Sequence, residues 1–150
     1  MNSATNMLPN HHRLCDNLFV SAEETTQSGD WAAAMPAFEH FRDQMRAHFE
    51  AEEGLLFPAF EAATGSNQGP TEMMRHEHEQ MRSLLSQLEA ACEAHDGAAY
   101  AGVAETLLML MQQHNMKEEN ILYPMCDQVL GAEGEALGVR MRATLEREDA

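Results

Sequence analysis

A motif of eleven residues occurs twice in the chain and constrains the fold more than any other feature. Residues 48–58 and 114–124 both read H-x-x-x-E-E-x-[LI]-L-[FY]-P, at an offset of 66 residues. At the same offset, and without gaps, His12 aligns with His78. Each half therefore carries one histidine, a second histidine 36 residues later and a glutamate four residues further on. This repeat predicts two related helical hairpins around a pseudo-two-fold axis.

The residue types favour helices throughout. Ala, Leu, Met, Glu and Gln are abundant and form helices well, whereas runs of the β-branched residues that favour strands are nearly absent. Asp30 and Asp96 are suited to cap the second and fourth helices. We therefore predict an all-α protein, an antiparallel up-down-up-down four-helix bundle with a short C-terminal fifth helix. The expected helices cover about residues 10–27, 30–63, 71–95, 96–130 and 135–146.

The chain fits one domain of 150 residues. We divide it into an N-terminal tail (1–9), the bundle (10–130), and a C-terminal short helix and tail (131–150). Pro58 and Pro124 lie near the ends of the second and fourth helices and are expected to kink or finish them. The residues expected to face the core are Phe38, Phe41, Met45, Phe49, Leu56, Val103, Leu107, Leu110, Met111 and Leu122, together with Met74, Met81 and Met109.

Charge and cysteine content exclude several functions. The formal charge of −16 disfavours nucleic acids and anionic membranes as partners. No apolar run reaches the roughly 18 residues of a spanning helix, and residues 1–10 do not resemble a signal peptide. The three cysteines are odd in number and widely spaced. These features predict free thiols in a soluble, cytoplasmic protein.

The repeated histidines and glutamates point to a metal centre. Residues i and i+4 share one face of a helix, so His48 and Glu52 point the same way, as do His114 and Glu118. Adding His12 and His78 gives four nitrogens and two carboxylates inside the bundle. Such a set suits a dinuclear centre. The lack of a thiolate set disfavours structural zinc and copper(I), so iron, or less well manganese, is the expected metal. Six ligands for two ions leave positions open for water, oxo or a diatomic molecule.

The chain resembles the hemerythrin-like, or HHE cation-binding, domain family over about residues 10–130. The resemblance rests on His12-Arg13-x-x-Asp16-x-Leu18-Phe19, on Glu77-His78-Glu79 and on the two repeated motifs. It implies that two iron ions, with an oxo or hydroxo group between them, are bound with Glu52 and Glu118 as bridging carboxylates. The implied ligands are His12, His48, Glu52, His78, His114 and Glu118.

The pattern departs from that of the oxygen-carrying hemerythrins. Those proteins have a second histidine four residues after the first on the third helix, where this chain has Arg82. The four-histidine, two-glutamate set is closer to the bacterial family that repairs iron centres after nitrosative stress. The leading hypothesis is a protein that binds dioxygen or nitric oxide for sensing, storage or scavenging. The alternative is a di-iron enzyme or stress protein that acts on peroxide or nitric oxide, or donates iron for repair of iron–sulfur centres.

The positions of the other histidines, of three further glutamates and of Cys15 can also be predicted. His11 should be exposed, because one helical step turns by 100° from His12. His40 should lie at the surface or just outside the centre, and His76 and His95 at the surface. Glu53 and Glu119 should be solvated or lie just outside the ligands, and Glu77 either accepts a hydrogen bond from a ligand imidazole or lies at the surface. Cys15 is expected to be a small buried hydrophobe. The protein partner is not identified by the sequence.

Overall fold

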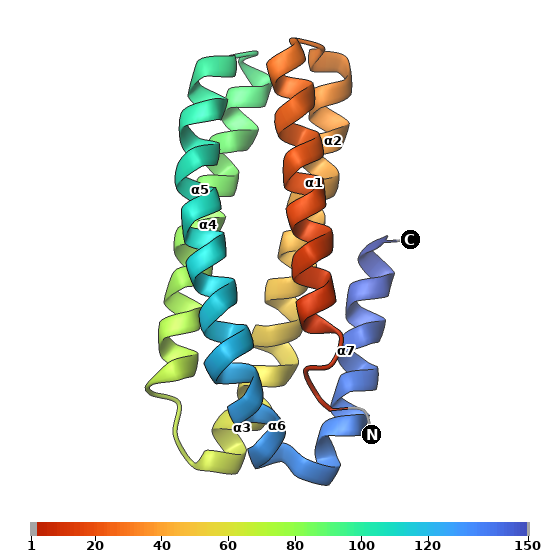
Figure 1. Ribbon diagram of the computed structural model, residues 1–150, viewed down its shortest axis with the longest axis vertical. Helices are drawn as coiled ribbons and strands as arrows, with labels where there is room; N and C mark the ends of the chain where they lie inside the picture. Colours follow the sequence, from red (N-terminus) through yellow and green to blue (C-terminus); the bar gives the residue numbers. More distant parts are fainter. Residues whose placement is uncertain (1–2, 150) are drawn as a thin grey trace.

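The structure is a computed structural model that describes residues 3–149, and all of its regular elements are helical. Two helical hairpins lie side by side with their axes nearly parallel (Figure 1). The first consists of α1 (Leu8–Ser28) and α2 (Trp31–Ala51), and the second of α4 (Pro70–Glu93) and α5 (Gly97–Lys117). This arrangement confirms the predicted all-α four-helix bundle.

The turns between paired helices follow from a few residues. Gly29 ends α1 in the left-handed region, with φ 77°, where a glycine costs little. Asp30 then caps α2, because its side chain accepts a hydrogen bond from the backbone N–H of Ala33 at 3.2 Å. Asp96 caps α5 in the same way, with Ala99 as donor at 3.0 Å. Both predicted caps are confirmed.

The second and fourth helices change type shortly before Pro58 and Pro124, since α2 ends at Ala51 and α5 ends at Lys117. A π-helical turn, η1 (Glu52–Leu56), follows α2, and a second, η2 (Glu118–Leu122), follows α5. Helices α3 (Phe57–Thr64) and α6 (Tyr123–Leu130) then begin, with Pro58 and Pro124 in their first turns. Each predicted helix, 30–63 and 96–130, is therefore interrupted near its proline, by a π turn that ends two residues before the proline.

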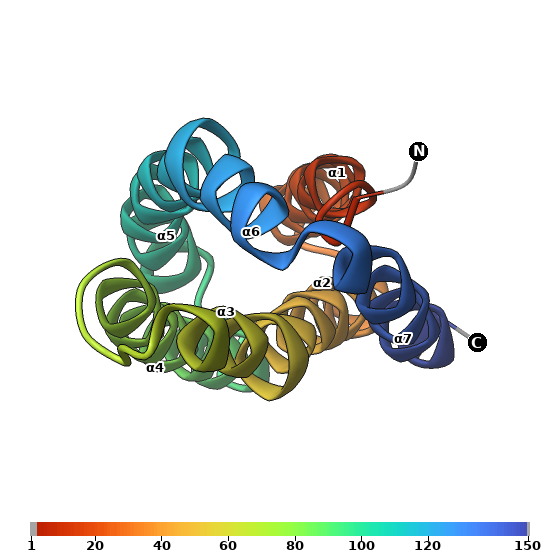
Figure 2. The ribbon, with the colours of Figure 1, turned by 90° about the horizontal axis from the view of Figure 1, so that it is seen from below.

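A fifth helix braces the lower end of the bundle. After the short 3₁₀ turn η3 (Gly131–Glu133), helix α7 (Gly134–Asp149) runs back along the outside of α2 (Figure 2). Thr5, before α1, donates a hydrogen bond from its hydroxyl to Asp127 of α6 at 2.8 Å. The N-terminal residues 3–7 therefore pack against α6 at the lower end of the bundle.

Two apolar clusters fill the interior. The upper cluster lies among α1, α2, α4 and α5 and includes Phe19, Phe38 and Phe41. The lower cluster lies among α3, α6, α7 and the lower ends of α1, α2 and α4, and it includes Phe57 and Met141. Most predicted core positions are buried, with Val103 and Leu110 half-buried. The prediction that Met109 faces the core is wrong, since Met109 is 58% exposed on the outer face of α5.

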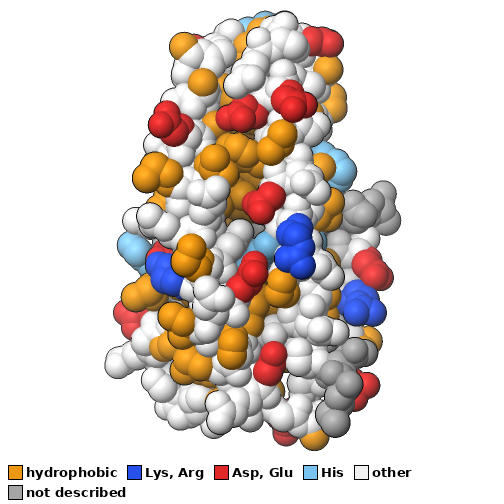
Figure 3. Space-filling view, viewed as in Figure 1, with side chains coloured by type: hydrophobic (Ala, Val, Ile, Leu, Met, Phe, Trp, Pro, Cys, Tyr) orange, Lys and Arg blue, Asp and Glu red, His pale blue; other side chains and the backbone are white. Residues whose placement is uncertain are grey.

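The surface carries the acidic charge that the sequence predicts. Acidic side chains are spread over the face in Figure 3, with few basic ones among them. Within residues 3–149, no helix combines the length and the apolarity needed to cross a membrane.

Candidate metal centre

All six predicted ligands lie between the two apolar clusters and are at most 4% exposed. His12 and His78 come from α1 and α4, His48 and His114 from α2 and α5, and the two glutamates open the π turns. Their donor atoms form two groups, each within 4.8 Å. We call these position A (His12, His48, Glu52, Glu118) and position B (His78, His114, Glu52, Glu118).

Each glutamate divides its two oxygens between the positions. Glu52 Oε2 lies 3.4 Å from His48 Nε2 in position A, and Glu52 Oε1 lies 3.0 Å from His78 Nε2 in position B. Glu118 Oε1 lies 3.0 Å from His12 Nε2, and Glu118 Oε2 lies 3.2 Å from His114 Nε2. This is the geometry of two carboxylates that can each bridge a pair of ions.

The outward nitrogens of three of the predicted ligand imidazoles donate to carboxylates. His12 Nδ1 bonds to Glu119 at 2.7 Å, and His78 Nδ1 bonds to Glu53 at 2.5 Å. These two contacts are equivalent under the 66-residue repeat. His114 Nδ1 bonds to Glu77 at 2.8 Å. The bonds fix each ring so that Nε2 faces the centre, and they give Glu53, Glu119 and Glu77 a defined place next to the ligands.

The fourth imidazole has a histidine as its partner. His11 Nδ1 lies 2.8 Å from His48 Nδ1, and His11 Nε2 lies 2.8 Å from Gln44 Oε1. Because a glutamine oxygen only accepts, His11 donates to Gln44 and accepts from His48. The expectation that His11 is exposed was wrong, since it is 7% exposed. In a bundle a helix faces two neighbours about 100° apart, so both His11 and His12 point inward.

The carboxylates dominate the protonation of the buried histidines. Burial by itself lowers the pKa of His48, but Glu52 and Glu118 outweigh it and raise the pKa to about 10. The pKa of His114 rises to about 9 by the same balance. Burial and the neighbouring His48 instead lower the pKa of His11 to about 4, so its imidazole is neutral.

Tyr123 is part of the centre, although the sequence gave it no role beyond its place in the motif. Its hydroxyl donates to Glu52 Oε2 at 2.6 Å and lies 2.9 Å from Glu118 Oε1. Burial and the two glutamates raise the pKa of Tyr123 well above its ordinary value, so the metal-free protein holds it as a phenol. Its equivalent in the other half is Phe57, which is why the motif [FY] gave no signal.

The donor set fits a pair of metal ions. Glu52 Oε1, Glu118 Oε2, His78 Nε2 and His114 Nε2 are buried and have no hydrogen-bond partner among the described residues. A buried polar atom without a partner costs about 1–3 kcal/mol. All four atoms converge on position B, where a cation would satisfy them together.

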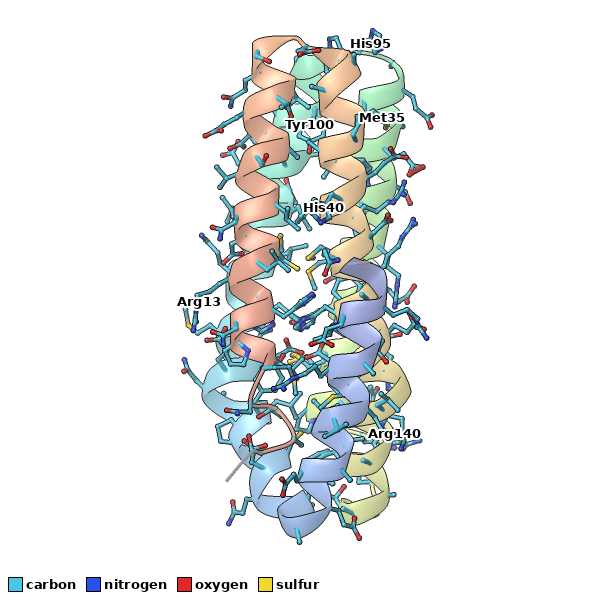
Figure 4. The ribbon with its side chains drawn as sticks, turned by 90° about the vertical axis from the view of Figure 1, so that its right-hand side faces the viewer. Arg13, Met35, His40, His95, Tyr100 and Arg140 are labelled. Atoms are coloured by element: carbon cyan, nitrogen blue, oxygen red, sulfur yellow. The ribbon has the colours of Figure 1, made fainter. Side chains whose placement is uncertain are left out.

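Three histidines and the three cysteines lie outside positions A and B. His40, His76 and His95 are exposed, as expected, and Figure 4 shows His95 at the far end of the bundle. Cys15, Cys92 and Cys126 are buried free thiols. Burial raises the pKa of Cys15, so it behaves as the small hydrophobe that was predicted.

One surface pocket reaches His12 of position A, and a second reaches the neighbouring Tyr123. One, of about 280 Å³, is lined by His12, Glu119 and residues of α1 and α5. The other, of about 230 Å³, is lined by Tyr123, Glu119 and residues before α1. A small molecule can therefore approach the side of the centre that holds His12 and Tyr123.

Comparison with known proteins agrees with this geometry. The family described as Hemerythrin HHE cation binding domain matches residues 3–126. An iron-sulfur cluster repair protein YtfE from Edwardsiella ictaluri (strain 93-146) is 32% identical over 116 residues, covering 70% of this chain and 52% of that protein. A protein of the same description from Musicola paradisiaca (strain Ech703) is 34% identical over 92 residues, covering 55% and 41%.

The chain thus spans about half the length of the curated relatives it matches. No solved structure matches it significantly. The family match covers most of the chain and includes all six residues of positions A and B. The chain belongs to the hemerythrin HHE cation-binding domain family.

Proposed function

We propose that His12, His48, Glu52, His78, His114 and Glu118 bind two iron ions, with Glu52 and Glu118 as bridges. The division of each buried carboxylate between two histidine pairs carries this proposal. The polar atoms that converge on position B without partners support it. Two unexposed carboxylates in an apolar interior are costly unless cations compensate them.

The donor types favour iron. Imidazole and carboxylate suit iron and manganese, and the two donor groups contain no thiolate among the described residues. The similarity to proteins described as iron-sulfur cluster repair proteins agrees with an iron protein. An oxo or hydroxo group between the ions would complete the bridge.

We propose further that the centre binds a small diatomic ligand, dioxygen or nitric oxide. Reduced iron with an open coordination position supplies that chemistry when bound. The protein supplies apolar walls above and below, outward hydrogen bonds that hold the imidazoles, and the two pockets that reach His12 and Tyr123. Sensing, storage and scavenging all fit such a site, and none requires a catalytic base.

The second candidate is a role in iron repair or in the breakdown of peroxide or nitric oxide. The names of the two relatives favour repair of iron–sulfur centres. A repair protein must release iron to an acceptor, whereas a binding protein must keep it. Loss of iron from the loaded protein to an apo iron–sulfur protein would therefore separate the two functions.

Metal analysis of the purified protein tests the assignment. We expect about two irons per chain and an optical spectrum that changes on reduction with dithionite. Glu52→Ala and Glu118→Ala should each lose at least one ion, because each removes one bridge. His95→Ala, with its side chain exposed at the end of the bundle, should lose none. Equal metal content in all three variants would contradict the proposal.

The response of the reduced protein to air distinguishes binding from turnover. A spectral change that reverses under vacuum supports a ligand-binding protein. Rapid irreversible oxidation, together with consumption of added peroxide, supports an enzyme. We place the protein in the reducing cytoplasm, which suits three buried free thiols.

A further inference from the structure

The two metal positions differ at one polar group. The 66-residue repeat places Tyr123 of α6 where the other half has Phe57 of α3. Both side chains are buried, at 3% and 0% exposure. The Phe57 ring stacks near His78 of position B, with 5.7 Å between ring centroids. Position A therefore has a phenol oxygen next to it, and position B has an aromatic hydrocarbon.

The phenol oxygen lies among all four donors of position A. It is 2.6 Å from Glu52 Oε2 and 2.9 Å from Glu118 Oε1. It is also 3.3 Å from the Nε2 atoms of both His12 and His48. The described polar contacts of this oxygen are thus all with proposed metal ligands.

Three of these four separations match those of atoms that share one ion. Protein nitrogens and oxygens bind transition-metal ions at about 2.0–2.2 Å. Neighbouring donors at such a distance, with bond angles of 90° to 110°, lie about 3 Å apart. The phenol oxygen falls in this range from three donors and lies closer, at 2.6 Å, to Glu52 Oε2. It is thus near four donors at once, whereas a hydrogen-bond donor needs only one acceptor.

We propose that Tyr123 is a fifth side-chain ligand of the ion in position A, which makes the two metal positions chemically different. This inference rests on the proposed di-iron function. On coordination the phenol loses its proton to solvent, and the phenolate oxygen binds the ion. A cation at bonding distance stabilises the deprotonated form of its ligand.

A second asymmetry occurs at the same position. His11 stands where the repeat has Glu77, so the outward partner of His48 is an imidazole and that of His114 is a carboxylate. Position A thus has one carboxylate partner among its outer hydrogen bonds, and position B has two. A phenolate ligand adds an anionic donor at the position with fewer carboxylate partners.

Absorption and resonance Raman spectra of the oxidised, iron-loaded protein test this inference. A phenolate bound to iron(III) gives a visible charge-transfer band, and excitation in that band enhances tyrosine ring vibrations. We expect both signals in the wild type and their loss in Tyr123→Phe. Tyr100→Phe is the matched control, because Tyr100 is the other tyrosine of the chain and is buried in the upper cluster (Figure 4). It should keep both signals.

A double variant that moves the phenol from one half of the repeat to the other should regain the charge-transfer band. Adding Phe57→Tyr to Tyr123→Phe places a phenol beside position B and should restore a charge-transfer band. Chelator should also extract one of the two irons at least about tenfold faster from Tyr123→Phe than from the wild type, in line with the cost of losing metal-site contacts.

The outcomes are separable. A wild type with two irons but no phenolate signals overturns the tyrosine ligand and leaves the di-iron proposal intact. A wild type without iron overturns both. If Tyr123→Phe does not fold, wild-type protein made with ring-deuterated tyrosine decides the question. The enhanced ring vibrations must shift on deuteration, and bands that do not shift contradict the proposal.

Discussion

At the scale of single residues, the imidazoles of the centre use their two nitrogens for different purposes. Nε2 faces the glutamates inside, and Nδ1 bonds to a partner outside. A carboxylate partner holds the ring in place and makes its inner nitrogen a stronger donor. Glu53 and Glu119 have this role at positions related by the repeat, so their removal should have matching effects.

We predict that Glu53→Ala and Glu119→Ala each weaken metal binding by about 10- to 100-fold, the usual cost of such a partner. The loss should concern position B for Glu53 and position A for Glu119, because they hold His78 and His12. Competition with a chelator of known affinity measures the effect. Glu105→Ala, an exposed site on α5, is the control. Affinities like that of the control would show that these bonds do not matter for binding.

The clustering of six histidine and glutamate side chains could be predicted from the sequence because the repeat selects them twice. The i, i+4 spacing then gives their direction on each helix. The inward position of His11 could not be predicted, because one helix does not reveal the angle between its two neighbours. The role of Tyr123 could not be predicted either, since Tyr and Phe have the same shape and differ by one oxygen whose surroundings are set by other helices.

At the scale of the helices, the centre is built where the α-helical pattern changes. The two proposed bridging glutamates, Glu52 and Glu118, are the first residues of π turns. These turns are closed by backbone bonds from Phe57 N–H to the Glu52 carbonyl and from Tyr123 N–H to the Glu118 carbonyl. π turns of this length are rare and occur often at functional sites. From the sequence, Pro58 and Pro124 predict only that the α-helical hydrogen-bond pattern is interrupted nearby. Whether a break, a kink or a π turn results depends on packing, so the turn could not be predicted.

The helix starts, in contrast, are set locally, and their contribution can be measured. We predict that Asp30→Ala and Asp96→Ala each lower the free energy of unfolding by about 1 kcal/mol. Each removes a bond to one backbone N–H at the far end from the metal centre. Denaturant unfolding measures the loss, and iron content should stay unchanged. Asp→Asn at either site keeps the capping oxygen and should be close to neutral. A loss in Asn as large as in Ala would contradict the capping role.

At the scale of the whole molecule, a polar layer separates two apolar clusters. The upper cluster joins the two hairpins, and the lower cluster joins the closing helices α3, α6 and α7. The histidines and glutamates of the centre come from both hairpins, so the proposed ions would connect the halves. The repeat and the short turns were enough to predict the bundle. The packing of α7 along α2 could not be predicted, because the sequence of α7 does not show which helix its apolar face will contact.

Because the proposed ions would connect the two hairpins, we predict that their removal lowers the melting temperature. A ligand that binds only the folded state stabilises it by about 2.7 kcal/mol at 100 times its dissociation constant. For a domain of this size that corresponds to about 5–10 °C for each ion. Thermal unfolding before and after chelation measures the shift, and Glu118→Ala should show a smaller one. Equal melting temperatures with and without metal would exclude a structural role for the ions.

The size of that shift should also depend on pH, in a direction that the buried histidines determine. In the metal-free protein, the pKa values of His48 and His114 are about 10 and 9, above the ordinary value of 6.5. Their protonation therefore stabilises the metal-free fold fully below pH 6.5, and this contribution is lost as pH rises through 9 to 10. Bound metal needs neutral imidazoles and does not share this loss. The difference in melting temperature between metal-bound and metal-free protein should thus be larger at pH 8.5 than at pH 6.5. A difference that narrows over this range would mean that protons and ions do not compete for the same nitrogens.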